Sequence, residues 1–197
     1  MPKFTKKSIP ALFALLTLLA YGLIIPWLGF YWDDWSFAWI AKFLGPAEFT
    51  PAFRPFRPFL GPIFFVTTSF LPPSPIVWQI FGLFTRFFSA LAAWWALRQI
   101  WPECKFQTLS ASLLFLVFPG YSQQWVALTH INQEWVSLIA YLFSFGLTAS
   151  ALRKPAKFKT HTVIALLLLF WGPLFFALDD KRTLARFLLH QRRVRFL

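Results

Sequence analysis

The chain has 197 residues, of which 58% are hydrophobic, 21% aromatic and 13% charged. A soluble domain carries about 25% charged residues, so this composition excludes an ordinary soluble globule. The net charge of +12 raises the question of a nucleic-acid partner, but such proteins gather their basic residues in one dense patch. Here the basic residues form small clusters between long uncharged stretches, which is typical of a multi-pass membrane protein and argues against nucleic-acid binding. A single cysteine excludes an intramolecular disulfide framework and a cysteine-based zinc site.

The first apolar segment, residues 10–32, contains no charged side chain and follows a basic start. Its apolar run is longer than that of a signal peptide, and no small-residue cleavage site follows it, so we expect a retained membrane span. The next apolar segment, 59–71, has only about 13 residues and is expected not to cross the membrane. Prolines stop it directly afterwards.

Four later segments are predicted to cross the membrane: 76–101, 102–118, 134–152 and 160–178. Pro102 suits the first turn of the second of these helices, and a Gly-Pro pair interrupts the last. The predicted fold is therefore an all-α polytopic transmembrane bundle of about five spanning helices. It includes a short re-entrant or juxtamembrane helix in the first outer loop.

The distribution of basic residues predicts the orientation. With a cytoplasmic N-terminus, nine cations lie inside, namely Lys3, Lys6, Lys7, Arg98, Lys105, Arg153, Lys154, Lys157 and Lys159. The outer loops then hold only Lys42, Arg54 and Arg57. This bias predicts a protein of the inner (cytoplasmic) membrane, and it requires that 59–71 does not cross.

The C-terminal tail breaks this rule, because 179–197 carries six basic residues and would lie outside after a fifth crossing. We therefore expect one transmembrane domain over 1–178. The tail is either a basic amphipathic helix on the membrane surface or the aberrant end of an incomplete chain. Alternatively, 160–178 turns back at its Gly-Pro pair.

Asp33 and Asp34 follow the first span directly, between Trp32 and Trp35. Poor solvation and a neighbouring charge raise the basicity of a carboxylate, so one of the two acids is a candidate catalytic base. The other would orient a substrate or bind a divalent cation, and Asp34 is the candidate metal ligand. The alternative is that both acids only mark the outer membrane boundary.

Three arginines are candidate phosphate-binding residues. Arg54 and Arg57 each precede a proline, which favours extended backbone and presents two guanidinium groups that could bind phosphate oxygens. Headgroup contacts by interfacial arginines are the alternative. Arg86 lies in the middle of a predicted span, on a small and polar face that should point into the bundle, shared with Gln79, Gly82, Ser89 and Ala93. A purely structural partner is its alternative.

The second outer loop, predicted before residue 134, has no lysine or arginine but many neutral hydrogen-bonding groups beside tryptophans. Gln124, Trp125 and His130 are candidate contacts to a sugar or an acceptor. An ordinary aromatic belt at the membrane interface explains the same residues equally well.

In their order, these features resemble the N-terminal part of a GT-C membrane glycosyltransferase of the protein O-mannosyltransferase-like branch. The resemblance covers about residues 10–152 and rests on the acidic pair after the first span, the Arg-Pro segment before a short helix, the apolar stretch ending at Pro119 and the polar stretch before Trp125. It implies an inverting transfer of a sugar from a polyprenyl-phosphate donor on the extracytoplasmic face.

By the same resemblance, Asp33 would be the base and Asp34 a positioning or metal-binding group, while Arg54, Arg57 or Arg86 would hold the lipid phosphate. Members of the family are much longer, so a truncated and inactive copy is also expected. The rival hypothesis is a non-catalytic integral membrane protein, such as an assembly partner or a truncated gene product.

Overall fold

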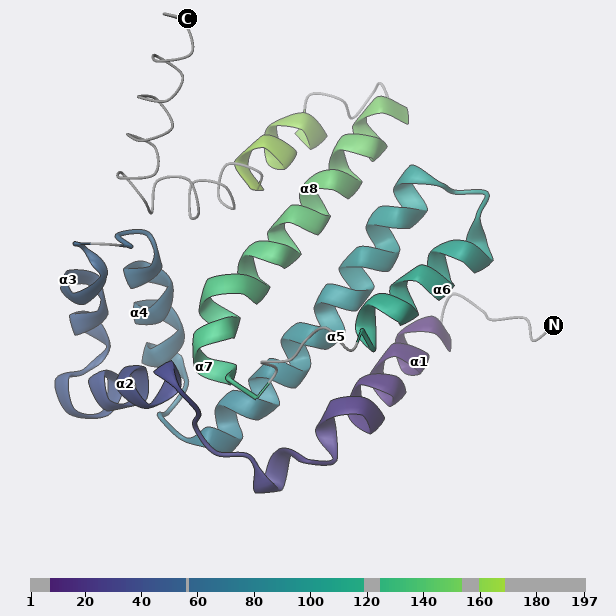
Figure 1. The fold of residues 1–197 in the computed structure, drawn as a ribbon. Coiled ribbons are helices and arrows are strands. Elements are labelled where there is room, and N and C mark those ends of the chain that lie inside the picture. Colours follow the sequence, from purple (N-terminus) through teal and green to yellow (C-terminus); the bar gives the residue numbers. More distant parts are fainter. Residues whose placement is uncertain (1–7, 56, 119–124, 154–159, 169–197) are drawn as a thin grey trace, which may run out of the picture.

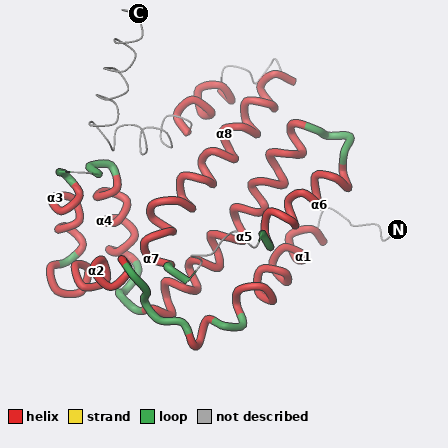
Figure 2. Tube along the Cα trace, viewed as in Figure 1, coloured by secondary structure: helices red, strands yellow, loops and turns green. Residues whose placement is uncertain are grey.

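The fold is seen in a computed structural model, which describes residues 8–55, 57–118, 125–153 and 160–168 (Figure 1). Within these ranges the regular structure is entirely helical, with eight α-helices, α1 to α8, and a further helical stretch at 160–168 (Figure 2). This confirms the predicted all-α class. Residues 169–178 of the predicted fifth span and the tail 179–197 lie outside the described residues.

Among the described residues, three helical segments are long and apolar enough to cross a membrane: Ser8–Trp27, Pro75–Ile100 and Ala127–Arg153. They indicate a multi-pass membrane protein. The first consists of α1 (Ser8–Thr17), a π-turn η1 (Leu18–Gly22) and a 3₁₀ turn η2 (Ile25–Trp27) around Pro26. Proline cannot continue the α-helical hydrogen-bond ladder, which accounts for the irregular end.

The second span is α5 (Pro75–Ile100), close to its predicted bounds. Next comes α6 (Lys105–Leu116), which is shorter than predicted. Its 12 residues extend about 18 Å, against a hydrocarbon core of about 30 Å. Pro102 lies in the bend before this helix and not in its first turn, so that detail of the prediction was wrong.

The third span begins earlier than predicted. It comprises α7 (Ala127–His130), a π-turn η5 (Ile131–Trp135) and α8 (Val136–Arg153). Residues 129–133, expected in an outer loop, are therefore helical. The expectation was wrong because three of their polar side chains, those of Thr129, Asn132 and Gln133, bond to Asp34, Thr67 and Arg57 in other segments.

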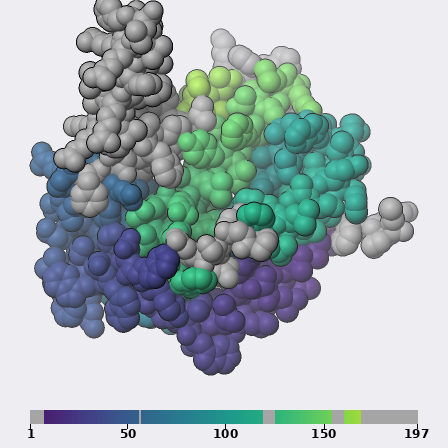
Figure 3. Space-filling model, in the orientation of Figure 1, coloured from purple at the N-terminus to yellow at the C-terminus, as the bar shows by residue number. Residues whose placement is uncertain are grey.

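Between the first two spans lie α2 (Asp33–Trp39), η3 (Ile40–Leu44), η4 (Pro46–Glu48), α3 (Phe49–Phe53) and α4 (Leu60–Phe70). The helix α4 confirms the separate short helix predicted over 59–71. It packs tightly against α3, since a Cβ added to Gly61 would lie 2.8 Å from the Cα of Thr50. Figure 3 shows this blue region against the green start of the third span.

The helices bury two apolar clusters. We call the first the outer cluster, after the orientation expected from the sequence. It joins α2, α3, α4, α5 and the start of the third span, and its large members are Phe30, Phe49, Phe53, Phe64, Trp78, Leu128, Ile131 and Trp135. The inner cluster joins α1, α5 and α6 through Ile9, Phe13, Ala90, Leu109 and Leu116. Where α5 meets α8, small residues allow close approach: a Cβ on Gly146 would lie 2.2 Å from the Trp95 ring.

Candidate functional site

The two adjacent acids open α2 and lie in opposite environments. Asp33 is exposed, whereas the exposed fraction of Asp34 is 0%. Successive side chains on a helix point about 100° apart, so neighbours in sequence can face different surroundings. The structure therefore places the two carboxylates in different surroundings, which the sequence did not predict.

Asp34 is bonded to the start of the third span. Its Oδ1 accepts hydrogen bonds from the backbone N–H of Thr129 at 2.8 Å and from the Thr129 hydroxyl at 2.7 Å. Thr129 lies in the first turn of that span, where backbone N–H groups have no partner within the helix. Asp34 thus caps this helix from 95 residues away in the chain, and the positive end of the helix dipole favours its carboxylate.

Burial raises the pKa of Asp34, and this effect outweighs the opposing effect of the hydrogen bonds from Thr129 and from the neighbouring backbone. Its second oxygen, Oδ2, is buried and has no hydrogen-bond partner. The protonated form of Asp34 is therefore more favourable than that of an exposed aspartate.

Trp32, immediately before the pair, has a backbone strained for a bulky residue. Its φ is +50° and its ψ is −122°, a region that favours glycine. The strained residue sits at the N-cap position of α2, directly before Asp33. The backbone of Trp32, directly before the acidic pair, thus has a conformation that tryptophan disfavours. The packing of the segments on either side maintains it.

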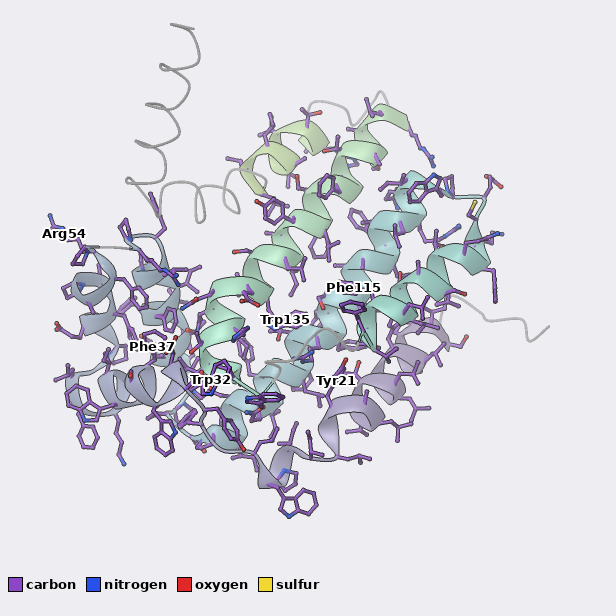
Figure 4. All side chains as sticks on the ribbon, viewed as in Figure 1. Tyr21, Trp32, Phe37, Arg54, Phe115 and Trp135 are labelled. Carbon is purple, nitrogen blue, oxygen red and sulfur yellow. The ribbon has the colours of Figure 1, made fainter. Side chains whose placement is uncertain are left out.

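The predicted arginines occupy three different places. Arg57 donates to Oε1 of Gln133 at 2.9 Å and so contacts the third span. Arg54 is exposed at the end of α3, and Figure 4 shows its side chain far from that of Trp32. The structure does not bring Arg54 to the acidic pair.

Arg86 lies inside the helix bundle, 5% exposed, between the rings of Tyr21 and Trp135. Its guanidinium carbon is 4.5 Å from the ring centre of Tyr21 in the first span and 4.7 Å from that of Trp135 in the third. Such cation–π contacts contribute about 2 kcal/mol or more when desolvated. The inward orientation predicted for its helix face is confirmed, since Gln79, Ser89 and Ala93 are also buried.

A small cavity of about 20 Å³ adjoins Arg86. The polar members of its wall are Tyr21, Gln79 and Arg86, and the rest of the wall is apolar. Gln79 donates to the carbonyl oxygens of Trp125 at 2.6 Å and Gly29 at 3.3 Å. A cavity of this size holds about one water molecule, so it has no room for a sugar.

The predicted sugar contacts are only partly described. Gln124 lies outside the described residues, and Trp125 is half-buried, with its carbonyl bonded to Gln79. The Nδ1 atom of His130 lies 2.9 Å from Oε2 of Glu134, one helical turn later.

Residues 127–135, which we call the junction helix, connect most of these groups. Thr129 contacts Asp34, Gln133 contacts Arg57 and Trp135 contacts Arg86. In addition, Oδ1 of the fully buried Asn132 accepts from the Thr67 hydroxyl at 2.8 Å. Thr129 and Asn132 were missed as site residues. Thr129 and Asn132 lie three residues apart, a spacing that places them on one side of a helix, but the many polar residues of this segment had favoured a loop.

The residues around Asp34 do not fit a divalent cation. Such ions require several oxygen acceptors, whereas the groups facing Oδ1 of Asp34 are donors. Among the described residues, no group of three or more histidine, cysteine or acidic side chains is placed to hold a metal. The expected metal role of Asp34 thus has no support here.

No family model, curated protein or solved structure matches this chain. The resemblance to GT-C transferases therefore remains an expectation based on the order of sequence features. The site has to be interpreted from its own geometry.

Proposed function

We propose that this chain is a membrane glycosyltransferase that moves a sugar from a polyprenyl-phosphate donor to an acceptor on the extracytoplasmic face. One observation carries the proposal: an exposed carboxylate, Asp33, is fixed to the outer end of two spans by its buried neighbour, Asp34. A catalytic base needs both access to the acceptor and a fixed position.

In this reaction Asp33 takes the proton of the acceptor hydroxyl as its oxygen attacks the anomeric carbon. The bond from that carbon to the polyprenyl phosphate breaks, and the configuration inverts. Of the arginines, Arg57 is our candidate for the lipid phosphate, because Arg57 and Asp34 contact the same junction helix. Arg54 is too remote from that helix, and Arg86 is enclosed by two rings.

The topology proposed with this function has a cytoplasmic N-terminus in the inner membrane and about five crossings. The contact between Asp34 and Thr129 supports it, because it puts the starts of α2 and of the third span on one side. Since α5 ends at the opposite side, the segment 101–126 has to return across, and α6 covers much of that path. A bond from the Tyr21 hydroxyl to the carbonyl of Leu116, 2.6 Å long, ties the end of α6 to the first span.

A non-catalytic membrane protein, such as an assembly partner or a truncated gene product, is the second candidate. It is favoured by the structural parts played by Asp34 and Arg86 and by the small size of the cavity at Arg86. On this hypothesis the acidic pair serves only to join helices.

A sugar-transfer assay distinguishes the two candidates. The full chain, reconstituted in vesicles with polyprenyl-phosphate sugars and an acceptor, is compared with its Asp33→Asn variant. Glu48→Gln is the matched control, since it removes another exposed acid between the same two spans. Loss of transfer in Asp33→Asn alone supports the proposal. Equal transfer in all three proteins contradicts the role of Asp33, and no transfer in any favours the non-catalytic candidate.

A further inference from the structure

One face of α2 and η3 exposes a row of large aromatic side chains. Trp35, Trp39 and Phe43 are spaced four residues apart, which places them on one side of a helix, and Trp32, directly before α2, is also exposed. The exposed fractions of the four side chains are 64% for Trp32, 64% for Trp35, 53% for Trp39 and 64% for Phe43. We call these four residues the aromatic face.

The opposite side of the same segment is packed. Asp34 and Ala38 are buried, and Phe37, Ile40 and Ala41 pack against the outer cluster. The usual distribution of a soluble amphipathic helix is therefore partly reversed. The packed side of this segment contains a carboxylate, and its exposed side is mostly apolar. An exposed apolar patch of this kind indicates a contact with a partner or a membrane.

The depth of the aromatic face is set by hydrogen bonds. Asp34, on the packed side, accepts from Thr129, the third residue of the Ala127–Arg153 span. In addition, only five residues separate Trp27, the last residue of the first span, from Asp33. Both connections hold α2 at the level where two spans leave the membrane.

That level is where tryptophan concentrates in membrane proteins, because its ring is apolar while its N–H bonds to the polar headgroups. Lys42 is exposed, and its Nζ lies 5.4 Å from the ring centre of Phe43, at the border of the face. A lysine in this position can keep its stem on apolar surface and extend its ammonium to lipid phosphates.

We propose that the aromatic face binds the headgroup region of the membrane's outer leaflet, so that α2 and η3 form an interfacial anchor. The anchor fixes the height of Asp33, which begins the same helix, above the membrane. The lipid contact does not depend on any transfer reaction, so failure of the sugar-transfer assay leaves it standing.

Site-directed spin labelling tests this contact. Cys104 is the single cysteine, so a Cys104→Ser background permits labels at chosen positions. Ser36→Cys is the mildest probe, because Ser36 is exposed one helical turn before Trp39 and its change removes no ring. Trp39→Cys is the second probe. Leu19→Cys, exposed in the first span, and Glu48→Cys, exposed between the spans, serve as lipid and water references.

The labelled chains are reconstituted in vesicles of phosphatidylcholine and phosphatidylglycerol, and collisions with oxygen and with a water-soluble nickel chelate are measured. We expect the oxygen-to-nickel ratio at Ser36→Cys and Trp39→Cys to fall between the two references. A ratio equal to that of Glu48→Cys would overturn the proposal by showing a water-facing surface. Immobile labels with few collisions of either reagent would also overturn it, by showing a protein on this face.

Discussion

The outer and inner halves of the described bundle use polar side chains in different ways. In the outer half, side chains bond to side chains of distant segments: Asp34 to Thr129, Arg57 to Gln133 and Thr67 to Asn132. In the inner half, side chains bond to backbone carbonyls. The serine and threonine hydroxyls of α5 and α6 bond within or just before their own helix, namely Ser89 to Arg86, Thr108 to Cys104 and Ser112 to Thr108, and the longer-range bonds of Tyr21 to Leu116 and of Arg153 to Ile100 also end on carbonyls.

The difference separates two ways of holding a membrane bundle together. Self-bonded hydroxyls and small residues let the inner helices approach closely without specifying one partner. The cross-links of the outer half specify which segments meet, and one of them is made by Asp34, the neighbour of the exposed Asp33. A fixed arrangement of side chains is what a chemical site needs, so the outer half is where function is to be sought.

The largest effect on these cross-links is expected from Asp34→Ala. It leaves two donors of Thr129 without their acceptor in a buried place, so we expect a loss of about 2–4 kcal/mol in the free energy of unfolding. Unfolding in mixed detergent micelles, followed by circular dichroism, measures it. Asp33→Ala is the matched control, with a change below about 0.5 kcal/mol because Asp33 is exposed. Similar losses in both variants would contradict the capping role.

The same residue makes stability depend on pH. Burial raises the pKa of Asp34 in the folded protein above its value in the unfolded chain. The stabilisation that follows from this pKa difference is therefore complete below the unfolded pKa. It is lost as the pH rises through the folded pKa. Unfolding measured over this range should show stability falling with pH in the wild type and a flatter profile in Asp34→Asn. An unchanged slope in the variant would assign the pH dependence to other groups.

A smaller effect is expected from Arg86→Lys, at the boundary between the two halves. Lysine keeps the charge, and its burial cost, but loses the planar group that lies between Tyr21 and Trp135. We expect a loss of about 1–2 kcal/mol. Arg54→Lys, on an exposed arginine, should change little in the same unfolding measurement. A stable Arg86→Lys variant would show that charge alone suffices there.

The smallest effect concerns the strained entry to the acidic pair. At the φ of Trp32, glycine is free of the strain that any side chain carries, so Trp32→Gly should be more stable than Trp32→Ala by about 1 kcal/mol. Both variants lack the indole ring, so their difference isolates the backbone. In an ordinary helix or strand alanine is more stable than glycine. If Trp32→Ala were the more stable variant here as well, strain at Trp32 would be excluded.

Rules of length and composition predict part of this fold from the sequence. The bounds of α4 and α5 follow from prolines at their ends and from apolar length, and Arg86 was recognised by its charge inside a span. The same rules fail at the start of the third span, because the partners of Thr129, Asn132 and Gln133 lie 65 to 95 residues away. Periodicity reports the faces of a helix but not which distant side chain will meet a polar residue.

The π-turn η5 has one further consequence, which concerns helical phase. A π-turn fits one extra residue into a helical turn, so the faces before and after it are offset by about 100°. Before the offset, Thr129 faces α2, and after it Gly146 faces the Trp95 ring of α5. Deleting a single residue between Ile131 and Trp135 would restore a uniform helix. Thr129 and Gly146 could then no longer face α2 and the Trp95 ring at the same time. The chain can satisfy its outer cross-links or its inner helix packing without η5, but only with η5 can it satisfy both.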